Sequence, residues 1–129
     1  MSEIAYSLTP AGPADWAQCE PHLLAALAHT KDWTIEDVAL AALRGYVALW
    51  KVECLGQIVG AGATTVTRYP RRQVMDILLF GGAGFPELLD TLKQLARSAG
   101  CASISGRGRK GWLRALPGAQ QIPAWEVEV

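Results

Sequence analysis

The sequence predicts an α/β protein of the α+β type, in which a mixed central sheet combines an antiparallel meander with one βαβ crossover and carries helices on both faces. Three observations predict this class. Two helical patterns open the chain, three strand patterns with short links follow, and a further helix is then flanked by strands. At 129 residues, half of them apolar, the chain fits a single domain spanning residues 1–129.

The first two elements have helical periodicity. Residues 15–30 hold an apolar stripe, and Pro21 marks either a kink in that helix or its true first turn. The second helix is expected to begin after Thr34, because Thr34 and Asp37 have the spacing of a capping box. Gly45 stands where a glycine commonly ends a helix.

The apolar period then changes from 3.6 to 2, which predicts three strands. They are expected over residues 46–54, 58–69 and 73–80. The links between them, residues 55–57 and 70–72, are short enough to make the neighbouring strands antiparallel.

A crossover follows the meander. The glycine-rich residues 81–84 are expected to break the third strand, and a helix should run over 86–99 with Pro86 at its first position. Residues 101–105 then return as a strand, parallel and adjacent to 73–80, in a right-handed βαβ unit.

The remaining residues predict a basic loop, a short helix over 112–116 and a last strand over 121–129. The last strand is expected because Trp125, Val127 and Val129 alternate with glutamates.

Basic side chains are concentrated in one part of the chain. The formal net charge is zero, yet nine of the twelve Lys and Arg residues lie within 68–114, where there are three acidic residues. The densest group includes Arg107, Arg109 and Lys110, which suits an anionic ligand or an acidic partner, with a solvated loop as the plainer alternative. The group lacks interleaved aromatic residues, so it does not favour nucleic acid.

Several classes of protein are not indicated. Cys19, Cys54 and Cys101 are odd in number and lack C-x-x-C spacing, which favours reduced thiols over a disulfide framework or a zinc site. His22 and His29 have no further ligand at metal spacing, so no metal is expected. No signal peptide and no apolar run of about 20 residues is present, which predicts a cytoplasmic protein without a membrane span.

The order of elements resembles the GNAT superfamily of N-acyltransferases along essentially the whole chain. GQIVGAGATTV resembles the long strand that follows a hairpin in these proteins, and ILLFGGAGFPELLDTL resembles the passage where they hold the coenzyme A pyrophosphate. CASISGRGRKGWLRALPGA is similar to their fifth strand and the helix after it. The small size, the tryptophan content and the GRKGW segment are also similar to GNAT-like proteins encoded by phages and prophages.

The resemblance implies an N-acyltransferase that uses acetyl-CoA or another acyl-CoA and an amine acceptor. The pyrophosphate would lie on the turn formed by Gly81, Gly82, Gly84 and Phe85, where backbone N–H groups and a helix dipole attract phosphate. Asp76, the one acid in the third strand, would be the base that deprotonates the amine. A carboxylate facing solvent on a strand is the alternative interpretation.

A second hypothesis stays open, because the chain departs from the family pattern. The family places Gln or Arg three residues before the first motif glycine, where this chain has Leu79. Many members also place a tyrosine after the fourth helix as the acid for the departing thiolate, and Tyr6, Tyr46 and Tyr69 all lie elsewhere. These departures favour a non-catalytic protein of the same fold that binds another protein, for instance in a phage particle or its assembly, located in the host cytoplasm or the virion.

Overall fold

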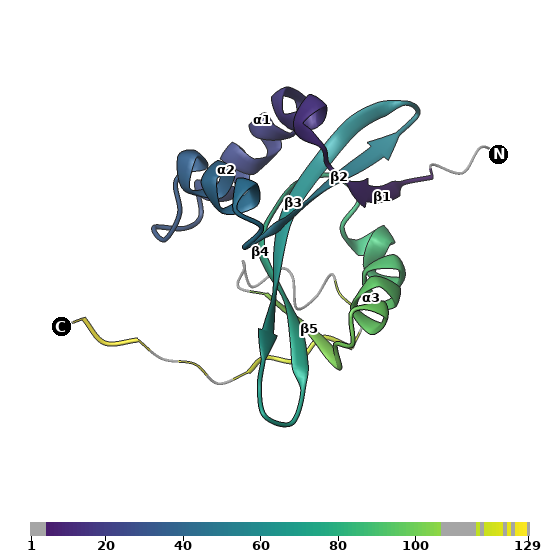
Figure 1. Cartoon of the computed structure of the whole chain (residues 1–129). Coiled ribbons are helices and arrows are strands. Elements are labelled where there is room, and N and C mark those ends of the chain that lie inside the picture. The colour runs from purple at the N-terminus through teal and green to yellow at the C-terminus, as the bar shows by residue number, and fades with distance from the viewer. Residues whose placement is uncertain (1–4, 107–115, 117, 123, 125, 129) are drawn as a thin grey trace.

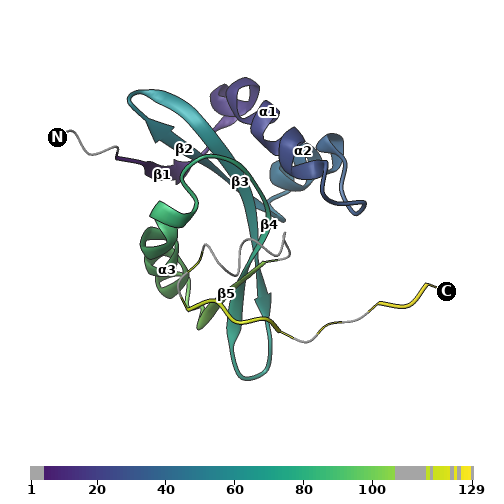
Figure 2. The same cartoon turned by 180° about the vertical axis from the view of Figure 1, so that it is seen from behind.

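The computed structural model describes residues 5–106, 116, 118–122, 124 and 126–128. They form a five-stranded sheet in the order β1-β2-β3-β4-β5. Helices α1 and α2 cover one face, and α3 covers the other (Figure 1), as the reverse view also shows (Figure 2). This is the mixed α+β fold that the sequence predicts.

The pairing of the strands confirms the predicted topology. The bounds are β1 Ser7–Pro10, β2 Ala48–Cys54, β3 Gln57–Arg68, β4 Gln73–Gly82 and β5 Ser103–Gly106. Strands β1 to β4 pair antiparallel in sequence, whereas β4 and β5 pair parallel. The predicted parallel pair is therefore confirmed, and α3 (Leu89–Ser98) makes the crossover between its strands.

The helices follow the prediction with shifted ends. A 3-10 turn, η1 (Pro13–Asp15), precedes α1 (Trp16–Leu27), and Pro21 lies inside α1, so it does not mark the first turn. A second 3-10 turn, η2 (Pro86–Leu88), replaces the expected first turn of the crossover helix. It leaves α3 shorter than the predicted 86–99.

The start of α2 (Ile35–Leu43) has the predicted capping box. The N–H of Asp37 donates to the hydroxyl of Thr34 at 3.2 Å, and the N–H of Thr34 donates to the carboxylate of Asp37 at 2.9 Å. The backbone N–H of Thr34, and then its side-chain hydroxyl, lower the pKa of Asp37, because hydrogen bonds to the carboxylate favour its ionised form.

Strand β4 is longer than predicted, and the expected break at residue 81 is wrong. Gly81 lies opposite Ala61, and Gly82 lies opposite Gly60, so both glycines belong to the strand. A register shift beside Ala63 leaves Leu78 as an extra residue of β4, which is a β-bulge.

The core lies on both faces of the sheet. The cluster under α1 and α2 consists of buried residues from those helices and from β3 and β4: Cys19, Leu23, Val38, Ala61, Ala63 and Leu79. A smaller cluster under α3 contains Met75, Ala96 and Cys101. All three cysteines are free, as predicted.

Two further differences concern the ends of the chain. β1 was not predicted, because a strand of four residues is too short to show a period and owes its conformation to pairing with β2. The predicted strand 121–129 is wrong for the residues described there, none of which is in a strand; Ile122 and Val127 are 65% and 68% exposed. Alternation alone does not make a strand without a partner that accepts its hydrogen bonds.

The predicted helix over 112–116 lies outside the described residues, apart from Leu116, which is not helical. Within the described part of the chain, every helix is too short or too polar to cross a membrane.

Candidate active site

The glycine turn, residues 81–85, covers the last two residues of β4 and the residues that follow, and it is packed tightly from behind. Gly82 and Gly84 have φ angles of +91° and +98°, a region that strongly favours glycine. A Cβ atom on Gly81 would lie 1.9 Å from the carbonyl oxygen of His22, and one on Gly82 would lie 2.3 Å from that of Val59. Helix α1 and strand β3 therefore require these glycines, whether or not a ligand binds to the turn.

The backbone of the turn is partly engaged as well. The N–H of Ala83 donates to the carbonyl of Val59 at 2.9 Å, and the N–H of Leu88 donates to the carbonyl of Gly84 at 3.0 Å. Gly82 and Ala83 are exposed, whereas Gly81, Gly84 and Phe85 are buried. Of the four residues predicted to contact a cofactor, only Gly82 thus presents its backbone at the surface.

The two aromatic residues of this region pack on each other beneath the turn. The rings of Phe80 and Phe85 meet edge to face, with their centroids 4.7 Å apart. The space beside them on the α3 face, lined also by Ile77 and Leu92, holds only about 10 Å³. That is room for a single water molecule at most.

His22 lies at the turn, although the sequence places it only on a helix surface. The Nδ1 atom of His22 is 2.8 Å from the position that a Cβ of Gly82 would take. The sequence gives no signal for this contact, because it joins α1 to a turn 60 residues further along the chain.

Asp76 lies on β4 between two neighbouring strands, with Thr65 of β3 opposite it on one side and Ser105 of β5 on the other. Its two carboxylate oxygens accept hydrogen bonds from the hydroxyls of Thr67 and Ser105. The carboxylate is half-buried. It is therefore neither freely solvated nor isolated, because two hydroxyl groups fix its orientation.

Asp76 and the glycine turn are separated along β4. Gly82 follows Asp76 by six positions, which corresponds to roughly 20 Å of extended strand. The pairing of β4 with β5 runs from Val74 to Ile77, so in the described part of the chain the bulge and the glycines lie beyond it. An extended ligand on β4 would have to bridge this distance.

The predicted basic group, Arg107, Arg109 and Lys110, lies outside the described residues.

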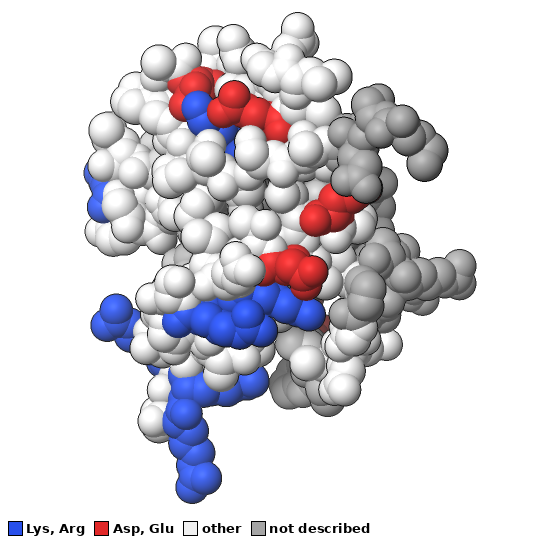
Figure 3. All heavy atoms as spheres, turned by 90° about the vertical axis from the view of Figure 1, so that its right-hand side faces the viewer, with Lys and Arg blue, Asp and Glu red and all other residues white. Residues whose placement is uncertain are grey.

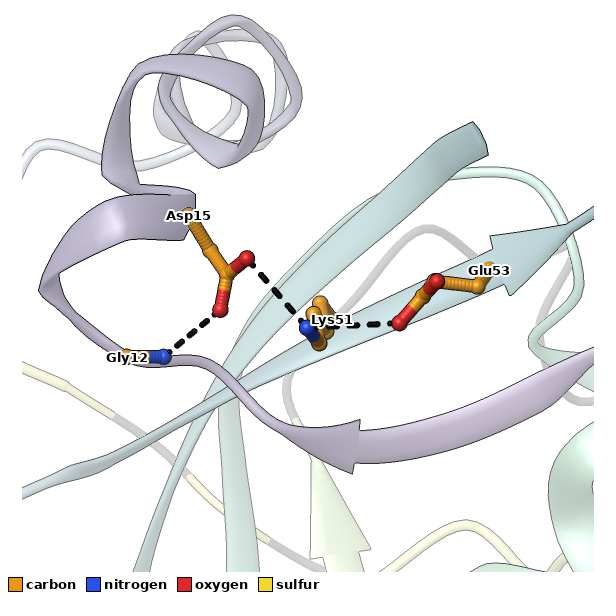
Figure 4. A network of polar contacts seen from close by, with 4 residues as sticks. All are labelled: Gly12, Asp15, Lys51 and Glu53. Atoms are coloured by element: carbon orange, nitrogen blue, oxygen red, sulfur yellow. Dashed lines mark hydrogen bonds and ion pairs between the residues drawn. The ribbon is translucent and has the colours of Figure 1, made fainter. Parts of the chain in front are cut away.

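An ion-pair network anchors the segment that leads into α1 (Figure 4). The ammonium group of Lys51 lies 3.2 Å from a carboxylate oxygen of Asp15 and 3.3 Å from one of Glu53. The second oxygen of Asp15 accepts the N–H of Gly12 at 2.8 Å. The network ties η1 to β2 and so helps to hold α1, which packs on Gly81.

The network shifts the pKa values of its members in the expected directions. The backbone N–H of Gly12, and then the ammonium of Lys51, lower the pKa of Asp15. Hydrogen bonds to Asp15 and Glu53 raise the pKa of Lys51. Burial raises the pKa of the Cys19 thiol in the adjoining core.

Within the described residues there is no group of three or more His, Cys, Asp or Glu side chains that could hold a metal ion.

Comparison with known proteins relates this geometry to one fold. No protein-family model matches the sequence, and no curated protein matches it. Solved structures do match. A GNAT family acetyltransferase from Staphylococcus aureus superposes with a TM-score of 0.67 at 14% identity, covering 96% of this chain and 98% of its own.

Two further acetyltransferases match over similar lengths. A ribosomal-protein-alanine N-acetyltransferase from Brucella melitensis gives a TM-score of 0.70 at 13% identity, covering 97% of this chain and 99% of its own. An aminoglycoside acetyltransferase from an uncultured soil metagenomic sample, solved with sisomicin, gives 0.67 at 12% identity, with 96% of each chain covered. The chain therefore has the GNAT fold, and at these identities the likeness establishes the fold alone.

Proposed function

We propose that this chain is an acyl-CoA-dependent N-acyltransferase of the GNAT type. The observation that supports the proposal best is the parallel β4–β5 pair joined by α3. The chain has this unit in a fold that it shares, over nearly its whole length, with acetyltransferases. Acetyl-CoA or another acyl-CoA would be the co-substrate, and an amine would be the acceptor.

The pyrophosphate of the co-substrate is proposed to lie over the exposed side of the glycine turn. Gly82 is exposed there, while α1 covers Gly81 and the side chains of Tyr6 and Val52 cover Gly84. The N–H of Glu87 and the dipole of the helix that follows would attract an anion, whereas Pro86 has no N–H and that of Leu88 donates to Gly84. Glu87 stands in the first turn of η2 and opposes this attraction. Gly81, Gly84 and Phe85 would then shape the turn from below.

Asp76 is proposed as the base that takes the proton from the amine as it attacks the thioester carbonyl. Each carboxylate oxygen already accepts one hydroxyl hydrogen bond and retains a lone pair that can accept a proton. The hydroxyls of Thr67 and Ser105 would keep the carboxylate in one orientation during the reaction.

The role of Asp76 is tested by the variant Asp76→Asn. In an acetylation assay with acetyl-CoA and a panel of primary amines, including an aminoglycoside and a peptide with N-terminal alanine, we expect kcat to fall about 10²- to 10⁴-fold. KM for acetyl-CoA should be unchanged, because Asp76 lies far from the turn. Asp90→Asn, which removes an exposed acid of α3, is the matched control and should retain wild-type activity. An Asp76→Asn enzyme with full kcat would show that Asp76 is not the base.

A non-catalytic interaction protein is the second candidate, and one observation favours it. Packing against α1 and β3, and for Gly84 against the side chains of Tyr6 and Val52, already accounts for the glycines of the turn, so their presence does not require a cofactor. Exposed apolar side chains of Leu40, Leu43 and Tyr46, on and just after α2, would then serve as the contact surface for a protein. A component of a phage particle is one form of this candidate. Absence of coenzyme A binding by the folded chain would favour it over the enzyme.

A further inference from the structure

The hairpin between β3 and β4 projects beyond the helices at the end of the sheet opposite the glycine turn (Figure 1), and the reverse view shows the same projection (Figure 2). Arg68 pairs with Gln73, and the N–H of Tyr69 donates to the carbonyl of Arg72 at 2.8 Å, so the chain reverses within two residues. Residues 68–72 are all exposed. We call these residues the hairpin tip; three of the five are arginines.

The end of α3 enlarges this basic surface. The N–H of Ala102 donates to the carbonyl of Gln73 at 2.9 Å, so the segment after α3 lies against the base of the hairpin. Lys93 and Arg97 are exposed and lie four residues apart near the end of α3. From this side of the molecule, Lys and Arg side chains gather over the lower part, with Asp and Glu above them (Figure 3).

No acidic residue occurs in the sequence of the hairpin tip or of the segment from the third residue of α3 through β5. Residues 66–75 and 91–106 contain five basic residues and no Asp or Glu. Asp76, the next acid along the chain, is held by Thr67 and Ser105. Asp90 of α3 lies three residues before Lys93, but among the described residues no ion pair joins a carboxylate to any of these five basic side chains, which therefore suit an anionic partner.

The side chains at the tip have the chemistry of a phosphate-binding surface. A guanidinium group binds a phosphate through two parallel hydrogen bonds, and four of the five basic residues are arginines. Tyr69 is 53% exposed, and the guanidinium carbon of Arg72 lies 6.0 Å from the centre of its ring. An exposed aromatic ring beside arginines offers a base a stacking surface. A two-stranded ribbon is also narrow enough to enter the major groove of a duplex.

An acidic protein partner fits this surface less well. Protein interfaces are organised around an apolar centre. The most exposed large apolar side chains, Leu43 at 85% and Leu55 at 91%, belong to α2 and to the β2–β3 turn, away from the tip. Beside the tip, Val66 is only 38% exposed. The combination of arginines and a tyrosine without an apolar centre favours nucleic acid.

We infer that the hairpin tip, together with Lys93 and Arg97, binds the phosphodiester backbone of a nucleic acid. This surface is separate from Asp76 and from the glycine turn, and the inference does not depend on acyl transfer. The inference also does not involve Arg107, Arg109 and Lys110. The sequence analysis found that this other basic group does not favour nucleic acid.

Fluorescence anisotropy with labelled oligonucleotides of about 20 nucleotides tests the inference. The probes are single-stranded RNA, duplex RNA and duplex DNA, which differ in groove shape but share the phosphate backbone. At 50 mM salt we expect a dissociation constant of about 1–10 μM for at least one of them, at the tight end of the range for non-specific binding at physiological salt. On duplex DNA the slope of log K against log salt should be about −3 to −4, since each phosphate contact contributes about 0.9.

The test variant is the double substitution Arg68→Glu with Arg71→Glu. Arg72 is left unchanged because its guanidinium lies 3.4 Å from the hydroxyl of Ser103 in β5, so replacing it would also remove a contact within the fold. The test variant should bind at least about tenfold more weakly and lower the magnitude of the slope by about 2. Lys31→Glu with Arg44→Glu is the matched control, because it makes the same change in charge at exposed sites outside the proposed surface. It should alter binding less than twofold. The neutral pair Arg68→Gln with Arg71→Gln should lie between wild type and the charge-reversed variant.

Three results would overturn the inference. One is the absence of binding to every probe at 100 μM protein. Another is an equal loss in the tip variant and in its control, which would indicate attraction by net charge alone. The third is competition by poly-glutamate as effective as competition by unlabelled oligonucleotide, which would instead indicate an acidic protein partner.

Discussion

Gly81 decides how closely α1 can approach the sheet. A Cβ at this position would stand 1.9 Å from the carbonyl oxygen of His22, which belongs to the helix backbone and cannot rotate away. Gly81→Ala should therefore destabilise the fold by about 3 kcal/mol, at the upper end of what overpacking costs. Urea unfolding followed by circular dichroism measures the change.

Gly106→Ala is the control for this substitution. Its Cβ would meet Ile77 at ordinary distances of 3.6 and 3.9 Å, and Gly106 does not have a positive φ. The control should change the free energy of unfolding by no more than about 0.5 kcal/mol. Equal stability of Gly81→Ala and wild type would show that α1 does not lie against β4 as described.

The residues around the candidate site show where sequence reasoning stops. Asp76 could be identified as the one acid of its strand, but its hydroxyl partners Thr67 and Ser105 belong to two other strands, 9 and 29 residues away. Likewise, the glycines predicted a break at residue 81, whereas Gly81 and Gly82 pair with β3, and their packing against His22 depends on how α1 docks. Contacts of this kind follow from the tertiary fold and leave no local pattern.

At the scale of elements, the Lys51 network should make the anchoring of η1 depend on pH. The pKa of Asp15 is lowered in the folded chain, so its contribution to stability is present above the ordinary carboxylate pKa of about 4 and is lost as the pH falls through the folded value. We therefore expect Asp15→Asn to lower Tm relative to wild type at pH 6. The two Tm values should converge below pH 4.

Differential scanning calorimetry from pH 2.5 to pH 7 measures this convergence. Lys51→Met removes the ammonium group that pairs with Asp15. In a Lys51→Met background, Asp15→Asn should therefore lower Tm at pH 6 by less than it does in the wild-type chain. A Tm difference between wild type and Asp15→Asn that stays constant over the whole range would contradict the role given to the network.

The elements that could be predicted are those with local signals. The capping box of α2 needs only residues three apart, and the strands of the meander show their period over seven or more residues. β1 has four residues and no such signal, and the extension of β4 through Gly82 depends on β3 opposite. The C-terminal residues 121–129 are the opposite case. They alternate like a strand, but none of the described residues among them is in a strand, because a strand pattern also needs a partner strand.

At the scale of the whole molecule, the order of elements was enough to predict the GNAT fold, which solved structures confirm at 9–15% identity. Order constrains topology because short links fix antiparallel neighbours and a crossover fixes the hand of a parallel pair. Chemistry is less constrained, because one fold serves proteins with different sites. Whether this chain uses acyl-CoA depends on its turn, where Leu79 and Glu87 provide no cation.

The turn can be probed without disturbing its glycines, whose positive φ angles and tight packing make them unsuitable for substitution. Ala83 is exposed, so Ala83→Glu places a carboxylate beside the proposed pyrophosphate, and Ala83→Gln adds the same bulk without the charge. Binding of coenzyme A should weaken about tenfold or more in the first variant, because like charges repel where water is partly excluded. It should change little in the second.

The most direct test of the acyl-CoA proposal is isothermal titration of the wild-type chain with acetyl-CoA. The proposal predicts saturable binding at one site per chain, with a matching rise in Tm, since a ligand that binds only the folded state stabilises it. Absence of both heat and a Tm shift at millimolar acetyl-CoA, with the protein folded by circular dichroism, would contradict the proposed acyltransferase and leave the non-catalytic interaction protein.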